Sequence, residues 1–454
     1  MVEILSDMLR PKCFSRPIGM AMGRRKPKQP GLWLSTEEIV KTAAHPFYRK
    51  VNEVLSQHGF DRKVEHLCQR FYRPIKGRPS LAPGVYFRLL LVGCCEGIDS
   101  ERGIAWQVAD SLSLREFLGF SLTEQTPDHS TISRTRRLYT LEVHKAVFRW
   151  CVLVLAGEGV LDAQTVAIDA TTLEANAAMR SIRRRDDGRK YEEYLKELAG
   201  AAGIEKPTKE QLARLDRKRN KKASNREWMS PSDPDARITK MKDGRTHLAH
   251  KAEHAVDLAS GALVAVTLQK ADQGDTTTVH ETLGETQAHA QLLNERGVEE
   301  VVADKGYHST ATLVALHQES VRSYIPEPER GRRQWRGRQM EQQRVHANRR
   351  RVQGRRGKQL QRVRSELVER SFAHMYETGG MRRTHLRKTD NILKRLLVHA
   401  VGFNLALMIR TQHGIGKPRS LQGLQERLHS AQVLLLALCV AGCAPQGRRG
   451  ELAA

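Results

Sequence analysis

The stretch that most constrains the fold is a short apolar segment ending on an acid, Thr165-Val-Ala-Ile-Asp-Ala-Thr-Thr172. Its larger apolar residues alternate with small ones, as in a half-buried strand, so Asp169 is predicted to lie where that strand leaves the core. The pattern returns at Glu299-Glu-Val-Val-Ala-Asp-Lys-Gly306, where an apolar run ends on Asp304 before a glycine turn. Taken singly, each aspartate fits a turn or helix cap; taken together, they predict two strands that end on carboxylates.

A third acid lies on a predicted helix, where Val368 and Phe372 share one face and Glu369 lies beside it. Glu366, one helical turn earlier, is the alternative candidate for the third acid. Three acids on two strand ends and a helix suit a pair of divalent cations about 3.5–4 Å apart, which stabilise the attacking and leaving oxygens of a phosphodiester. Mg²⁺ takes oxygen ligands and keeps several waters, so a few carboxylates are enough.

The charge of the chain indicates a polyanionic partner. Lys and Arg number 76 against 51 Asp and Glu, which gives a net charge of +25 over 454 residues. Nucleic acid is the first choice, because a ribosomal or structural basic protein would not need paired strand-end aspartates. The seven cysteines are odd in number and lie mostly in apolar segments, so we expect core thiols in a reducing cytoplasm. No apolar run reaches the 18 or so residues that a membrane span needs.

The patterns divide the chain into four parts. Residues 1–31 are predicted to be a flexible basic arm, 32–157 a helical domain, 158–412 an α/β domain and 413–454 a peripheral tail.

The helical domain contains a candidate DNA-binding helix. In Thr126-Pro-Asp-His-Ser-Thr-Ile-Ser-Arg-Thr-Arg-Arg137, Asp128 or Ser130 can cap a helix that carries Arg134, Arg136 and Arg137. Such a helix suits a helix-turn-helix module. An ordinary amphipathic surface helix explains the pattern equally well.

Two basic insertions interrupt the α/β domain, at about 180–228 and 330–364. The second holds fourteen Lys or Arg and a single acid, so contact with DNA through it should depend strongly on salt. A solvated linker is the alternative for the first. Between the two insertions, the sequence predicts a hairpin around Ser260-Gly261. Asp257 on this hairpin and Asp275 in Asp272-Gln-Gly-Asp275 are predicted to be turn residues and not metal ligands. A long amphipathic helix from Asn391 to Arg410 is predicted to close the domain.

Three motifs together resemble the DDE transposases of bacterial insertion sequences: Ala167-Ile-Asp-Ala-Thr-Thr172, Val302-Ala-Asp-Lys-Gly-Tyr-His308 and Glu366-Leu-Val-Glu-Arg-Ser-Phe372. The resemblance implies a ribonuclease-H-like catalytic domain with a mixed central sheet, preceded by an all-helical DNA-binding domain. It also implies that Asp169, Asp304 and Glu369 are catalytic and hold two Mg²⁺ or Mn²⁺ ions.

The same resemblance implies cleavage at the terminal inverted repeats of the chain's own element and attack of the freed 3′-hydroxyl on target DNA. It further implies a dimer on DNA and a cytoplasmic, nucleoid-associated protein without a membrane segment.

The chain departs from some of these families around the glutamate. They carry an arginine four residues before it and a lysine seven after, where this sequence has Ser365 and Tyr376. The supporting basic residues, predicted to contact DNA, are therefore Lys305, Arg364, Arg370, Arg382 and Arg383. Two other functions fit the sequence: a related nuclease that cleaves without strand joining, and a non-catalytic DNA-binding repressor or inactivated relic.

Overall fold

The computed structural model describes residues 45–72, 80–218, 224–241, 243–329, 331 and 333–418. The predicted basic arm (1–31), the first residues of the predicted helical domain (32–44) and most of the predicted tail lie outside these residues.

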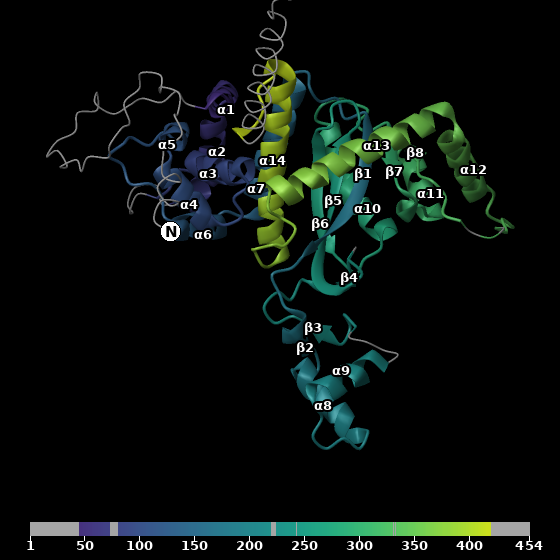
Figure 1. Cartoon of the computed structure of the whole chain (residues 1–454). Helices are drawn as coiled ribbons and strands as arrows, with labels where there is room; N and C mark the ends of the chain where they lie inside the picture. The colour runs from purple at the N-terminus through teal and green to yellow at the C-terminus, as the bar shows by residue number, and fades with distance from the viewer. Residues whose placement is uncertain are drawn as a thin grey trace, which may run out of the picture. The chain divides into compact units, whose positions relative to one another are not determined.

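The first described region is helical throughout, as predicted (Figure 1). Its helix with three arginines begins after Asp128, whose carboxylate accepts a hydrogen bond from the backbone N–H of Ser130 at 2.8 Å, so Asp128 is the cap. The four described cysteines are free and buried. The helices are α1 (Pro46–Gln57), α2 (Phe60–Cys68), α3 (Pro83–Glu96), α4 (Glu101–Asp110), α5 (Leu112–Leu118), α6 (His129–Leu138) and α7 (Leu141–Gly157), with a 3₁₀ turn η2 (Gln69–Phe71).

A mixed central sheet follows, which confirms the predicted fold class. Its order is β4-β5-β1-β7-β8, and β6 pairs with β5 beyond the end of β4. β5 is antiparallel to β1, β4 and β6, whereas β1, β7 and β8 run parallel. The strands are β1 (Thr165–Glu174), β4 (Arg237–Lys240), β5 (Thr246–Asp257), β6 (Leu263–Lys270), β7 (Glu300–Ala303) and β8 (Arg322–Tyr324).

Helices cover both faces of the sheet. Successive strand residues point to opposite faces, and in β5 His254 bonds to Ser371 of α13 while Glu253 bonds to Thr278 of α10. α13 crosses the strands and contacts β1, β5, β7 and β8 (Figure 1). The helices that follow β6 and precede α14 are α10 (Asp275–Ala290), α11 (Thr310–Gln318), α12 (Gln339–Gln353) and α13 (Arg355–Ala373), which continues into a π turn η5 (His374–Thr378).

The first basic insertion forms a small folded module between β1 and β5. It contains a short 3₁₀ turn η3 (Met179–Ser181), β2 (Arg183–Arg184), α8 (Tyr191–Ala201), α9 (Lys209–Lys218) and β3 (Trp228–Met229). Trp228 is buried at the centre of its core, with Tyr191 and Tyr194 packed edge-on against it. The second insertion is mostly helical, because α12 and the first half of α13 occupy it.

The last described helix, α14 (Thr389–His413), differs from the amphipathic helix predicted there. It is buried on nearly all sides because α3 and α7 pack against it together with β6. Among the described residues, it alone is long and apolar enough to cross a membrane, but 94% of its most apolar window is buried inside the molecule. α14 is therefore a core helix.

Candidate active site

Asp169 and Asp304 lie next to each other on neighbouring strands. Asp304 follows the end of β7, as predicted, but Asp169 lies in the middle of β1 and not at its end, because pairing with β5 extends β1 to Glu174. β1 and β7 pair in parallel, with Ile168 opposite Ala303, so each aspartate is the next residue along its chain. Asp169 therefore lies where β1 runs past the carboxyl end of β7, and the carboxyl ends of strands are where ligands bind in open α/β sheets.

The Asp304 turn is shaped by the residue types that follow the acid. The Asp304 Oδ1 accepts a hydrogen bond from the Gly306 N–H at 2.8 Å and so caps the short 3₁₀ helix η4 (Lys305–Tyr307). A Cβ on Gly306 would lie 2.5 Å from the Asp275 Oδ2 and 3.0 Å from the Asp304 Oδ1. Glycine is therefore required because two carboxylates approach the same point of the backbone.

Asp169 is held from both sides. Its Oδ2 accepts a hydrogen bond from the Arg364 Nη2 at 2.6 Å, and its Oδ1 accepts one from the Ala170 N–H at 2.8 Å. Burial raises the pKa of the Asp169 carboxyl, and the nearby Asp304 and Asp275 add to this rise, while Arg364 opposes it. The cost of burying this charge thus exceeds the stabilisation from its arginine partner.

Glu369 lies on α13, on the exposed side of the helix. It has no hydrogen bond or ion pair within the described residues, whereas Glu366 pairs with Arg370 at 2.7 Å. Across the described ranges, no group of three or more His, Cys, Asp or Glu side chains is arranged to hold a metal ion. The structure therefore brings Asp169 and Asp304 together, and Glu369 does not complete a three-acid site with them.

The predicted DNA-contacting residues fall into two groups. Arg134, Arg137 and Lys305 are exposed, and so are Arg370, Arg382 and Arg383. The other two point inward: Arg136 forms an ion pair with Glu101 of α4, and Arg364 is only 8% exposed beside Asp169.

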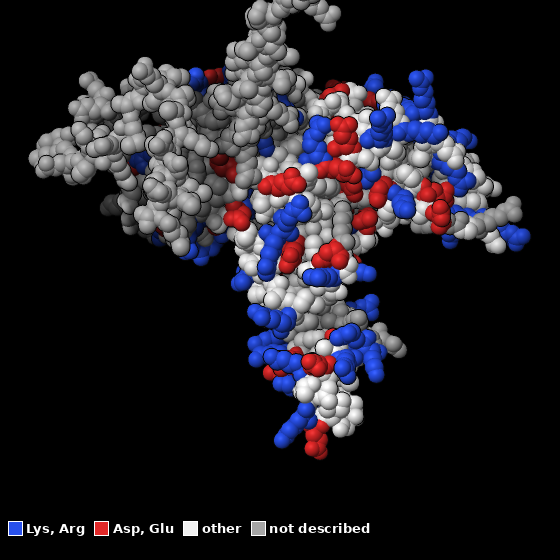
Figure 2. Space-filling model, viewed as in Figure 1, with Lys and Arg blue, Asp and Glu red and all other residues white. Residues whose placement is uncertain are grey.

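Charge is unevenly spread over the face shown in Figure 2. Acidic and basic side chains lie together over α13 and the adjoining part of the sheet, and basic side chains predominate over α12 and over the α8–α9 module. The basic flanks suit the binding of a polyanion.

Three charged residues near this edge were not singled out from the sequence as site residues: Lys251, Glu253 and Asp275. Asp275, expected to be a turn residue, begins α10 and forms an ion pair with Lys251 at 2.5 Å. Glu253 is fully buried. The available signal was two charged residues in a strand whose neighbours are mostly alanine, histidine and valine. Asp257, in contrast, is the predicted turn residue, since it accepts hydrogen bonds from Ser260.

The strand order, with Asp169 and Asp304 side by side and a helix crossing the sheet, defines a ribonuclease-H-like domain. Residues 161–405 match the protein family described as Transposase DDE domain, and residues 35–138 match the one described as Transposase domain (DUF772). No curated protein and no solved structure matched the chain. Because the first match covers more than half of the chain, the protein belongs to the DDE transposases of insertion-sequence type. It is a DNA-processing enzyme, and DNA is its partner.

Proposed function

We propose that this transposase cleaves the ends of its own insertion sequence and joins the freed 3′-hydroxyl to target DNA by metal-dependent phosphoryl transfer. Asp169, Asp304 and Glu369 are the catalytic and metal-binding residues of the proposal. The observation that carries it is the register of β1 and β7, because it aligns the first two acids although 135 residues separate them in the chain.

The carboxylates of Asp169 and Asp304 fit hard divalent cations. Both are carboxylates, and Mg²⁺ or Mn²⁺ prefers oxygen ligands and retains water where the protein offers few of them. Asp169 already has a cationic partner in Arg364, so its surroundings accommodate positive charge. Two such ions, when bound, supply charge stabilisation for the attacking and leaving oxygens of a phosphodiester.

The chain's own residues hold the acids in place for this reaction. Arg364 and the Ala170 N–H fix the Asp169 carboxylate, and the Gly306 N–H fixes that of Asp304. Glu369 is exposed and has no competing ion pair among the described residues, so its side chain can turn toward DNA lying over Asp169 and Asp304.

The DNA-binding part of the proposal rests on exposed basic residues. Arg134 and Arg137 on α6 contact the terminal inverted repeats, and Lys305, Arg382 and Arg383 contact DNA near the acids. Two ends must be held together for transposition, so the active form is a dimer on DNA.

The test replaces the two neighbouring aspartates separately, as Asp169→Ala and Asp304→Asn. Both variants should bind a duplex that carries the element's end but cleave it at least about a thousandfold more slowly than the wild type. The measurement is strand cleavage and strand joining with Mg²⁺, resolved on a denaturing gel. Substantial cleavage by both variants would refute the assignment.

The third acid has a matched control on the same helix. Glu369→Gln should abolish cleavage, whereas Glu366→Gln should stay near wild type because it loses only an exposed ion pair worth about 0.3–0.5 kcal/mol. Loss of cleavage in Glu366→Gln with normal cleavage in Glu369→Gln would instead identify Glu366 as the third catalytic acid. Products that are only hydrolysed and never joined would favour a nuclease, and DNA binding without any cleavage would favour a repressor.

A further inference from the structure

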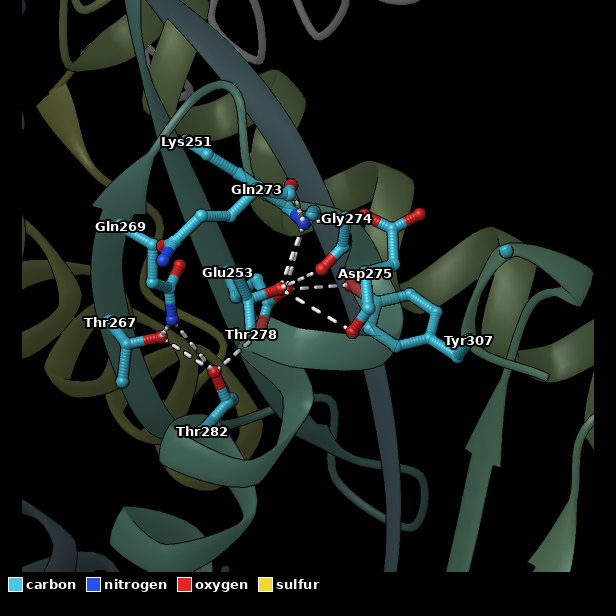
Figure 3. A network of polar contacts seen from close by, with 12 residues as sticks. Lys251, Glu253, Thr267, Gln269, Gln273, Gly274, Asp275, Thr278, Thr282 and Tyr307 are labelled. Atoms are coloured by element: carbon cyan, nitrogen blue, oxygen red, sulfur yellow. Dashed lines mark hydrogen bonds and ion pairs between the residues drawn. The ribbon is translucent and has the colours of Figure 1, made fainter. Parts of the chain in front are cut away.

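A buried network of charged and hydroxyl side chains lies on the α10 face of the sheet. Figure 3 shows Lys251, Thr278 and Tyr307 pointing toward the carboxylate of Glu253. That carboxylate is fully buried and accepts hydrogen bonds from Thr278, from Thr282 at 2.5 Å and from the Tyr307 hydroxyl at 3.2 Å. The three hydroxyls that donate to this acid therefore come from α10 and from the turn that follows Asp304.

Lys251 is the cation of the network, and it is only 5% exposed. Its Nζ donates to the Asp275 Oδ1 at 2.5 Å and to the Thr278 hydroxyl at 2.8 Å, and it lies 3.4 Å from the Glu253 Oε1. One buried ammonium is thus shared between two carboxylates. Apolar residues of similar volume often replace such buried ionic groups without loss of stability, so stability alone does not account for them.

The network reaches the Asp304 turn at two points. Tyr307, the last residue of η4, is anchored on Glu253, and Asp304 is the cap of the same short helix. Gly306 lies against the Asp275 carboxylate, which Lys251 holds by its other oxygen. The position of the turn therefore depends on Lys251 through both of its acidic partners.

We propose that Lys251 is a positioning residue for phosphoryl transfer, and that its contacts with Asp275 and Glu253 hold the turn that places Asp304. This inference rests on the proposed function of Asp304. Because its ammonium is enclosed by Asp275, Glu253 and Thr278, Lys251 acts through these residues and not by binding a DNA phosphate.

The experiment uses the full chain with Lys251→Met, Asp275→Asn and Tyr307→Phe. Single-turnover cleavage of the element's end should slow by about 10–100-fold in each variant, the range seen when residues that orient metal ligands are lost. Mn²⁺ affinity without DNA, followed by electron paramagnetic resonance, should fall by about tenfold or more. The dissociation constant for the DNA end and its salt dependence should stay at the wild-type values.

Lys270→Met is the matched control, because Lys270 is an exposed lysine at the end of β6 and pairs with His250, the residue before Lys251. It should cleave and bind Mn²⁺ like the wild type. If Lys251 instead contacted a phosphate, its variant would lower the slope of log K against log salt by about 0.9, and the positioning role would be overturned.

If Lys251→Met does not fold, the positioning role is tested with Asp275→Asn and Tyr307→Phe, because both substitutions nearly preserve the shape of the side chain. Folded forms of these two variants with wild-type cleavage and Mn²⁺ affinity would overturn the inference. That result is distinct from failure of the proposed function, which would appear as cleavage by the Asp169→Ala and Asp304→Asn variants.

Discussion

At the scale of single residues, the site is built at a cost to the stability of the fold. Asp169 is half-buried, and burial raises the pKa of its carboxyl more than Arg364 lowers it. A group with a raised pKa binds more protons in the folded state than in the unfolded state, so its contribution to stability falls as the pH rises through that interval.

Asp169→Asn should therefore raise the unfolding temperature of the metal-free protein at pH 7, although it abolishes cleavage. The gain should shrink as the pH falls through the raised pKa of Asp169 toward about 4, the ordinary value for aspartate. Thermal unfolding, followed by circular dichroism between pH 7 and about pH 4, measures this difference in unfolding temperature.

Asp243→Asn provides a control of opposite sign, because the backbone N–H of Arg245 and the His247 ring lower the pKa of Asp243. This variant should be less stable than the wild type at pH 7, and its deficit should vanish as the pH falls. A lower unfolding temperature for Asp169→Asn at pH 7 would contradict the argument.

At the scale of elements, α6 shows how one helix divides its arginines between two tasks. Arg134 and Arg137 are exposed, while Arg136 faces α4 and pairs with Glu101. Residues three or four apart share a helix face and adjacent residues do not, so a basic run along a helix cannot present every charge to one ligand.

The double variant Arg134→Ala, Arg137→Ala should bind the element's end more weakly and lower the slope of log K against log salt by about two. Arg136→Ala should leave that slope unchanged and reduce the free energy of unfolding by about 1–3 kcal/mol, because Glu101 loses its charged partner. Fluorescence anisotropy at several salt concentrations and chemical denaturation separate the two effects. An equal change of slope in the double variant and in Arg136→Ala would contradict the separation of DNA-binding from structural arginines on α6.

At the scale of the whole molecule, α14 joins the helical region to the sheet. α3 and α7 contact this helix together with β6, and Gly402 permits close approach to Cys94, whose Cβ would lie 3.4 Å from an added Cβ. The Asn404 side chain binds both the N–H and the C=O of Leu263, at 2.8 and 2.9 Å. We therefore expect the two regions to unfold together.

Asn404→Ala should lower the free energy of unfolding by about 1–3 kcal/mol for each backbone group left unpaired. Arg410→Ala, at an exposed position of the same helix, should change it by less than about 0.5 kcal/mol. Calorimetry should show one transition for both regions in the wild type. Separate transitions for the helical region and the sheet would contradict the role given to α14.

The sequence by itself determined the local features of this protein. Alternation of apolar residues located the strand that contains Asp169 and the strand that ends just before Asp304, although the first continues to Glu174. Composition indicated a polyanionic partner, and the Asp-Lys-Gly-Tyr motif carried the resemblance that the family match confirmed. These features are readable because periodicity and turn chemistry depend on residues close together in the chain.

Only the tertiary structure decided which side chains meet. Arg364 is paired with an aspartate 195 residues away, Lys251 is enclosed by Asp275 and Glu253, and α14 is buried on both sides where an amphipathic helix was predicted. Such contacts depend on strand register and on how helices pack across the sheet. Local periodicity reports that a residue is buried, but it does not report what lies against it.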